Sequence, residues 1–324
     1  MTFLRRFGID TYMLLLIGVV VMGAVLPARG MAAAALSQIT FWAVALLFFI
    51  YGAKLDTASV RAGILNLRLQ SLCFLATYAL FPVLGIGIAW LAGGMLGPEL
   101  TLGILFLAVL PSTIQSSIAF TAMAGGNVPA AICSASISNL VAVVLTPALM
   151  ALILHQSGGI STDAIGKIAL QILFPFILGQ LLRRWIGGFI QQHKFLTMIV
   201  DRGSILLIVY SAFSAGTVAG IWSAIPASRL ILLGAIVCVF LAVVMWLMVL
   251  TGRHFQLPDP DRTTLLFCGS TKSLASGLPI ATAIFAASQV GAVVLPLMLF
   301  HLIQLLVCAV IAQRKATSNA SVPA

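Results

Sequence analysis

Apolar runs separated by short polar or glycine- and proline-containing breaks extend along nearly the whole chain. Most of these runs have the roughly 20 apolar residues that a helix needs to cross a bilayer. The pattern predicts ten spanning helices, at about 11–27, 37–53, 69–93, 100–124, 128–154, 165–182, 203–220, 230–251, 263–287 and 290–312. The fold class is therefore an all-α polytopic membrane protein, with residues 1–312 forming a single ten-helix unit. The polar residues 313–324 are predicted to form a disordered cytoplasmic tail.

Few charges are available for a water-facing surface. Hydrophobic residues make up 61% of the chain and charged residues only 7%, whereas a soluble domain has about 25% charged residues. The net charge of +10 does not indicate a nucleic-acid partner, because the basic residues are scattered between apolar runs and form no single patch. The predicted partner is the lipid bilayer.

The basic residues alternate with the predicted spans in a way that sets the orientation. If the amino terminus lies in the cytoplasm, thirteen of the 17 lysines and arginines fall on the cytoplasmic side, and only Arg29, Lys167 and Arg229 fall outside. Because cytoplasmic loops carry the excess of basic residues, both termini are predicted to be cytoplasmic. The short loops are typical of a bacterial plasma (inner) membrane protein.

The ten spans divide into two sets of five, 11–154 and 165–312. A repeat with an odd number of spans must be inverted in the membrane. The fourth span of each set contains a polar interruption, at 110–117 in the first and 268–273 in the second. Both interruptions lie near mid-bilayer if the helices rise about 1.5 Å per residue. We therefore expect helices 4 and 9 to be broken and to cross, which is typical of a transport site.

Lys272 is the only charged residue between Thr263 and Gln313. Counting about 1.5 Å per residue from Arg262 places it ~15 Å deep, about half of a ~30 Å bilayer core. A lysine at that depth faces protein or water and usually marks a functional site. The alternative is a kinked helix whose lysine bonds to a neighbouring backbone carbonyl.

Polar residues of the two interruptions and of the fifth span form the candidate substrate and ion site. They are Lys272, Thr271, Ser270, Ser273, Ser112, Thr113, Gln115, Ser116, Ser117, Ser138 and Asn139. Alternatively, serines in spans bond to their own helix or let helices pack closely. In the tenth span, His301 and Gln304 share a helix face. His301 is a candidate proton-linked group, with a packed, hydrogen-bonded histidine as the alternative.

Signals for metal binding, disulfides and catalysis are weak. The five cysteines lie in apolar segments without metal-ligand spacing, so no disulfide, metal or other cofactor is predicted. A serine–lysine dyad with Lys272 is disfavoured, because adjacent helix positions do not face each other. The chain has no Gly-x-Ser-x-Gly or His-Glu-x-x-His motif and no charged ring of a channel. The sequence therefore predicts neither an enzyme nor a channel.

Taken together, these features resemble the bile acid:sodium symporter superfamily, solute carrier family 10, and in particular the branch around its seventh mammalian member. Besides the broken spans, the fifth span carries Leu145-Thr146-Pro147. The matching stretches are 5–12, 26–30, 110–121, 126–131, 133–139, 200–204, 267–279 and 295–301. The resemblance implies a core domain around the crossing helices and a panel domain that moves against it. Substrate would bind at the helix 4/9 crossover under alternating access.

The same resemblance implies a sodium site, from which this sequence departs. The bile-acid carriers hold sodium with a glutamate, a glutamine and an asparagine of the ninth span, and Phe267, Thr271 and Lys272 stand at those positions here. Partners from the fourth and fifth spans would be Ser116, Ser117, Ser138 and Asn139. Because the acidic ligand is missing, our hypothesis is that the Lys272 ammonium takes the place of sodium or binds an anionic substrate group. The half-helix ends and Gln115 would then assist the anion.

The predicted function is secondary active transport of a small organic anion, with sodium or a proton as the coupling ion. One alternative is a membrane regulator of ion homeostasis, since the resembled branch has been linked to calcium handling. A second is sodium-coupled symport of a bile-acid-like anion.

Overall fold

The computed structural model describes residues 11–54, 66–155, 170, 174–220 and 225–320, and all the regular elements in these residues are helices. Six of those helical segments are long and apolar enough to cross a membrane: 31–53, 67–96, 128–153, 195–218, 227–254 and 287–317. The protein is therefore a polytopic membrane protein, as predicted.

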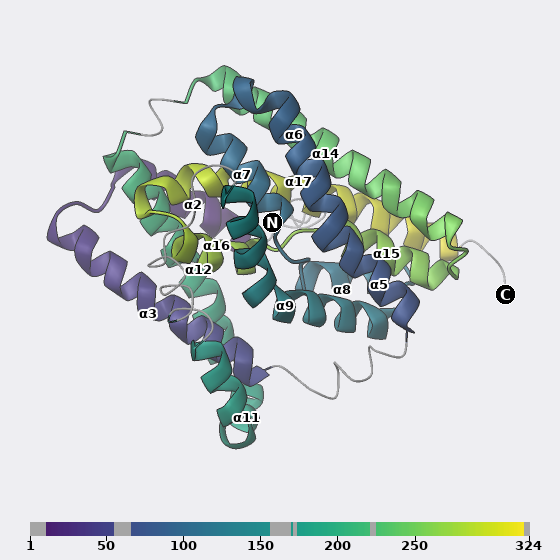
Figure 1. The fold of residues 1–324 in the computed structure, drawn as a ribbon. Helices are drawn as coiled ribbons and strands as arrows, with labels where there is room; N and C mark the ends of the chain where they lie inside the picture. The colour runs from purple at the N-terminus through teal and green to yellow at the C-terminus, as the bar shows by residue number, and fades with distance from the viewer. Residues whose placement is uncertain (1–10, 55–65, 156–169, 171–173, 221–224, 321–324) are drawn as a thin grey trace.

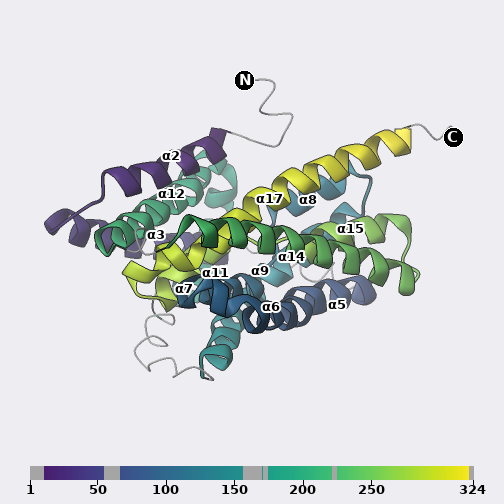
Figure 2. The ribbon, with the colours of Figure 1, turned by 90° about the horizontal axis from the view of Figure 1, so that it is seen from above.

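The helices follow the predicted order of apolar runs. They are α2 (Thr11–Val25), α3 (Met31–Lys54), α5 (Leu67–Leu75), the π-helix η2 (Ala76–Leu80), α6 (Phe81–Leu96), α7 (Pro98–Ala108), α8 (Gln115–Met123), α9 (Val128–His155), α11 (Phe174–Gln192), α12 (Lys194–Val218), α14 (Ala227–His254), α15 (Asp259–Ser270), α16 (Leu274–Ile284) and α17 (Ala287–Ala320). In Figures 1 and 2, α2, α3 and α12 lie together at one end of the molecule, and α5, α6, α14 and α15 lie toward the other.

Two helices end well beyond the predicted boundaries. The sixth span was predicted at 165–182, a range whose start lies outside the described residues, and α11 extends ten residues further to Gln192. Arg183 and Arg184 do not end this helix, because arginine is a good helix former. Likewise, α17 continues to Ala320, where a disordered tail was predicted from residue 313. The residues 313–320 contain no proline or glycine, so nothing local interrupts the helix.

The third apolar run contains a widened turn. The π-helical residues of η2 join α5 to α6, and Pro82 follows in the first turn of α6. A proline cannot donate a backbone hydrogen bond to the carbonyl four residues earlier, here that of Tyr78, and its ring crowds that carbonyl. A π-turn relieves this conflict and often marks a functional position.

The two polar interruptions are true helix breaks. The first separates α7 from α8 over residues 109–114, and the second separates α15 from α16 over residues 271–273. The backbone N–H of Ser273 donates to the carbonyl of Pro111 at 2.8 Å. Both breaks therefore meet in space, although 156 residues of chain separate them.

Close helix packing explains two buried glycines. A Cβ atom at Gly52 of α3 would lie 2.1 Å from the carbonyl oxygen of Phe176 in α11. The converse contact is similar, because a Cβ at Gly179 of α11 would lie 2.0 Å from the carbonyl oxygen of Phe49. Only glycine permits backbones to approach this closely, so α3 and α11 form a tight pair.

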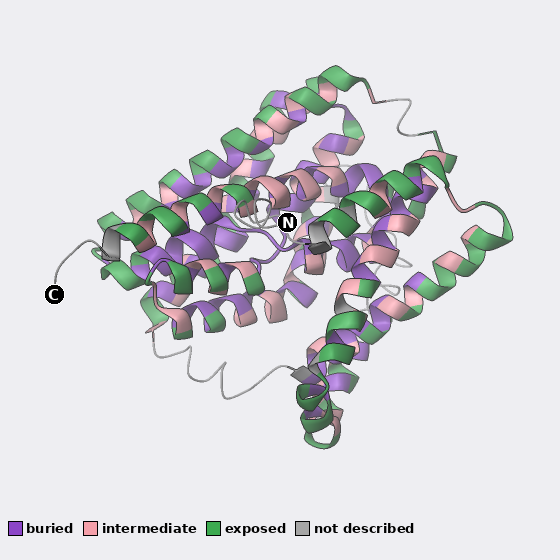
Figure 3. Ribbon diagram, turned by 180° about the vertical axis from the view of Figure 1, so that it is seen from behind, coloured by how far each residue is buried: buried purple, intermediate pink, exposed green. Residues whose placement is uncertain are grey.

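Burial separates an interior from an apolar outer surface, as the inward and outward faces in Figure 3 show. The interior includes the fully buried Phe81, Phe240 and Phe300, whose rings contact one another. Large apolar side chains also cover the outside, and Trp90 and Trp246 are 82% and 59% exposed. Such a surface is stable in lipid, where these side chains contact acyl chains.

A buried carboxylate joins three helices at one end of the bundle. Asp261, in the first turn of α15, accepts hydrogen bonds from the side-chain amides of Asn66 at 2.9 Å and Asn127 at 2.8 Å. The amide oxygens of these two asparagines accept from backbone N–H groups at the starts of α5 and α9. Asp261 therefore fixes the relative position of three helix starts.

Replacing Asp261 with alanine is expected to lower the free energy of unfolding by about 2–4 kcal/mol, because two charge-assisted bonds are lost and two amides are left without their acceptor. The measurement is the thermal midpoint in detergent. Asp259→Ala is the matched control. Asp259 lies in the same turn and forms an exposed ion pair with Arg262 at 3.1 Å, which contributes little in water. Equal losses in the two variants would contradict a special role for Asp261.

Candidate functional site at the helix crossover

The side chain of Lys272 lies at the centre of the crossover and is fully buried. Its ammonium donates hydrogen bonds to the carbonyl oxygens of Thr77 at 2.9 Å, Ala108 at 3.0 Å and Leu110 at 2.6 Å. The nitrogen also lies 4.0 Å from the centroid of the Phe81 ring, a cation–π contact. The lysine of one broken helix therefore binds the end of the other.

These contacts match the chemistry of a charged lysine. An ammonium has three N–H donors and no acceptor, and three carbonyl acceptors surround it here. Ala108 ends α7, so the positive charge lies at the negative end of that helix dipole. Within the described residues no carboxylate contacts the ammonium, and backbone dipoles supply the negative potential that an acidic side chain would otherwise provide.

The third acceptor depends on the widened turn of η2. Thr77 lies within this π-helical segment, and its carbonyl oxygen accepts from the lysine rather than from a regular α-helical N–H. Its hydroxyl donates back to the carbonyl of Cys73 at 2.9 Å. The irregular backbone at 76–80 therefore provides part of the site.

Beside the lysine, hydroxyl groups of both breaks form a compact cluster. Thr271 Oγ1 donates to the carbonyl of Phe267 at 2.9 Å and lies 3.0 Å from Ser112 Oγ, 3.1 Å from Thr113 Oγ1 and 2.8 Å from Ser117 Oγ. Ser116 Oγ extends the cluster by donating to Thr113 Oγ1 at 2.7 Å. These groups are buried or half-buried, and they satisfy one another across the crossover.

Residues of α9 hold both breaks from a third side. Asn139 Nδ2 donates to the carbonyl of Ser112 at 2.8 Å, and Asn139 Oδ1 accepts from Ser276 Oγ at 2.5 Å. Ser138 Oγ accepts from the backbone N–H of Ser112 at 3.1 Å. Ser273 Oγ accepts from the backbone N–H of Ser276 and caps α16. The predicted residues of the fourth, fifth and ninth spans thus come together in one network.

Gln304 of α17 belongs to this network, although the sequence only indicated that it shares a face with His301. Its Oε1 accepts from the backbone N–H of Lys272 at 2.8 Å, and its Nε2 donates to the Lys272 carbonyl at 2.8 Å. One amide side chain therefore replaces the backbone partners that the broken helix lacks at this residue. The only sequence signal was an amide side chain within an apolar span.

The match with known proteins extends over the whole membrane region. A profile of the SBF-like CPA transporter family matches residues 10–317. The chain belongs to this family of membrane transporters.

Relatives of this family member come from bacteria and vertebrates. PA2026 of Pseudomonas aeruginosa, an uncharacterized protein, is 50% identical over 313 residues, which cover 96% of this chain and 94% of that protein. YfeH of Escherichia coli, described as a candidate symporter, is 45% identical over 308 residues, covering 94% and 92%. Sodium/bile acid cotransporter 7 of Mus musculus is 26% identical over 277 residues, covering 84% and 82%. These relatives confirm the resemblance stated from the sequence, and those with a described activity are named as transporters.

Three candidate residues of this family member lie at the margin of the network. Ser270 Oγ donates to the carbonyl of Leu266 in its own helix at 2.5 Å, which is the alternative expected for a serine in a span. Gln115 begins α8 with an exposed side chain. His301 is partly exposed, and its Nδ1 lies 2.9 Å from Gln304 Nε2.

Proposed function

We propose that the protein is a secondary active transporter of a small organic anion that works by alternating access at the crossover of the broken helices α7/α8 and α15/α16. The observation that carries this proposal is the buried Lys272 ammonium, bound by carbonyls at the end of the opposite broken helix. A charged group held by half-helix ends at mid-membrane is the usual construction of a transporter site. The family membership supports the same class of function.

The proposed architecture is a ten-span unit over residues 1–312, made of two inverted halves. Its support is that helix contacts recur between the halves. In the first half α6 packs on α7, and in the second α14 packs on α15; α12 packs on α2, as α11 packs on α3. The four helices α2, α3, α11 and α12 would form the panel, and the others would form the core. Thirteen of 17 basic residues on one side support cytoplasmic termini in a plasma (inner) membrane protein.

Of the two roles considered for Lys272, the contacts favour substitution for a bound cation. All three ammonium N–H groups are donated to backbone carbonyls, so none is left for an anion. Carbonyl and hydroxyl oxygens are the ligands that hard cations prefer, and the lysine ammonium would present its positive charge to them. In this arrangement the site needs no sodium, and the coupling ion is a proton or absent.

The substrate anion would then meet the accessible polar edge beside the lysine. Gln115 is exposed and Ser116 and Asn139 are half-buried, and the first two begin α8. The amino-terminal end of a helix carries partial positive charge and free N–H groups, which favour an anion. Gln115 would donate its amide N–H to that anion.

The test is binding and uptake of a panel of organic anions, each measured in sodium and in choline buffer. We expect one anion to raise the melting temperature equally in both salts by binding the folded state, and to accumulate in proteoliposomes. Gln115→Ala should weaken its binding about tenfold or more, as expected for one lost bond to a charged group. Gln289→Ala, an exposed glutamine of α17, should bind as the parent does.

Other outcomes of this test would favour one of the two alternative functions. Binding that requires sodium would contradict substitution by lysine and favour sodium-coupled symport, in line with the name of the mouse relative. Binding without uptake would contradict transport and favour a membrane regulator of ion homeostasis.

A further inference from the structure

One face of α11 carries a polar stripe without any acidic residue. Its members recur at helical spacing over three turns, so they lie on one side of the helix. They are Gln180, Arg183, Arg184, Gly187, Gly188 and Gln191. The proposed transport site uses none of them, and they lie on a different helix from all of its residues.

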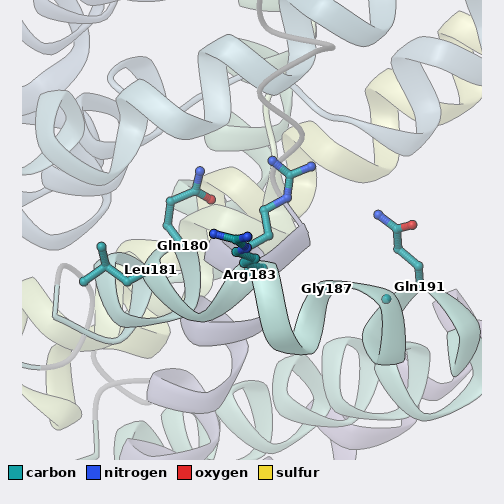
Figure 4. Close-up of a pocket in the computed structure, with 7 residues that line it drawn as sticks. Gln180, Leu181, Arg183, Gly187 and Gln191 are labelled. Carbon is teal, nitrogen blue, oxygen red and sulfur yellow. The ribbon is translucent and has the colours of Figure 1, made fainter.

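The stripe lines an open groove of about 450 Å³. Figure 4 shows Gln180 and Gln191 extending from the same side of α11 as the Arg183 side chain. Gly188 leaves the groove open, because a Cβ atom there would meet nothing within 4 Å. The side-chain oxygen of Gln180 is buried and has no hydrogen-bond partner within the described part of the chain. The groove thus combines two guanidinium groups with amides.

Apolar side chains border this groove on the remaining surface of α11. Leu181, Trp185 and Phe189 are 67%, 73% and 59% exposed. Exposed tryptophan and arginine in the same turns are typical of the membrane–water interface, where aromatic rings lie at headgroup level. In the proposed orientation this end of α11 lies in the cytoplasmic leaflet.

We propose that this groove binds the phosphate group of an anionic phospholipid. Guanidinium groups match the geometry of phosphate oxygens and bind them through paired hydrogen bonds. Basic pockets beside spanning helices on the cytoplasmic side are suited to anionic headgroups, since lipid tails follow the apolar flank. Exposed Leu181 lines the groove, Trp185 follows Arg184 in the chain, and both would contact the acyl chains.

A lipid at this position would act on the proposed panel. The groove lies on the face of α11 adjoining its tight contact with α3, where the Cβ of Gly187 would lie 3.7 Å from the carbonyl oxygen of Ala53. A bound headgroup would therefore stabilise the α3–α11 pair in one arrangement. The inference uses the proposed orientation only to choose the leaflet, and it stands whether or not the crossover transports an anion.

The test measures lipid binding to the purified full-length protein by native mass spectrometry and by melting temperature. The probes are dioleoylphosphatidylglycerol, dioleoylphosphatidylcholine and inorganic phosphate. Two variants change the groove in different ways. Arg183→Gln with Arg184→Gln removes the charge, and Gly188→Leu fills the open space while keeping both arginines. Leucine also has the higher helix propensity, so this variant should fold.

Each variant has a matched control on α14. Arg253→Gln removes an exposed arginine, and Gly234→Leu adds a leucine where the Cβ meets nothing within 4 Å. We expect the parent and both controls to prefer phosphatidylglycerol over phosphatidylcholine by about tenfold, because the choline cation cancels the net charge that the two arginines attract, and both groove variants to lose that preference. An unchanged preference in the groove variants would overturn the proposal. Equal stabilisation by inorganic phosphate would also overturn it, since the site would then bind a free anion rather than a lipid.

Discussion

Lys272→Ala is expected to make the stability of the protein depend on sodium, which the parent should not show. The substitution removes the ammonium and leaves the carbonyls of Thr77, Ala108 and Leu110 around an empty space. Each buried carbonyl without a donor costs about 1–3 kcal/mol, so we expect a loss of at least about 3 kcal/mol in choline buffer. Sodium can bind three carbonyl oxygens directly and should recover part of this loss.

Measurement of the thermal midpoint against sodium concentration tests this prediction. A ligand that binds only the folded state raises the midpoint as its concentration rises above its dissociation constant. Lys315→Ala serves as the control, because Lys315 is also a hydrogen-bonded lysine but contacts Thr263 Oγ1 at the end of the core. Equal midpoints of Lys272→Ala in sodium and choline would rule out the view that the lysine takes the place of a cation.

The same variant separates the two roles of the lysine in function. If the ammonium only joins the broken helices, sodium should restore anion binding to Lys272→Ala together with stability. If the ammonium contacts the anion, stability should recover but binding should not. The contacts of the parent favour the first result, because the lysine has no free N–H group.

Much of this site could be predicted from the sequence because charge is rare in the membrane. Lys272 is the only charged residue between Thr263 and Gln313, and the polar breaks at Ser112 and Thr271 interrupt apolar runs. The contacts also include the bonding to backbone carbonyls that was the alternative expectation for this lysine. The acceptor carbonyls, however, belong to other helices. The acceptors themselves had no sequence signal, since the backbone carbonyl of Ala108 or Leu110 is the same whatever the side chain.

Helix ends were harder to predict than helix order. The predicted spans end where charges interrupt apolar runs, as at Arg183. A charged residue with good helix propensity, however, can end a membrane span without ending the helix. The predicted span therefore ended ten residues before α11 does and left out the polar residues from Arg183 to Gln191. The helical continuation to Ala320 has the same cause.

Gln304→Leu is expected to lower the free energy of unfolding by about 2–5 kcal/mol and to weaken anion binding. Leucine fills a similar volume but leaves the backbone N–H and carbonyl of Lys272 without partners, and each buried group costs about 1–3 kcal/mol. Gln304 is itself fully buried, so water cannot replace it. Gln313→Leu, an exposed position of the same helix, should change the thermal midpoint little.

His301→Ala distinguishes the two parts of the Gln304 network. Because the backbone of Lys272 fixes the orientation of the Gln304 amide, Nε2 must donate to His301 Nδ1, and the neutral imidazole then carries its proton on Nε2. Removing the ring leaves both bonds to Lys272 intact, so the loss of stability should be smaller than for Gln304→Leu. If His301 carries a coupling proton, the pH dependence of transport should disappear in this variant. A pH profile like that of the parent would instead identify His301 as a packed partner that only orients Gln304.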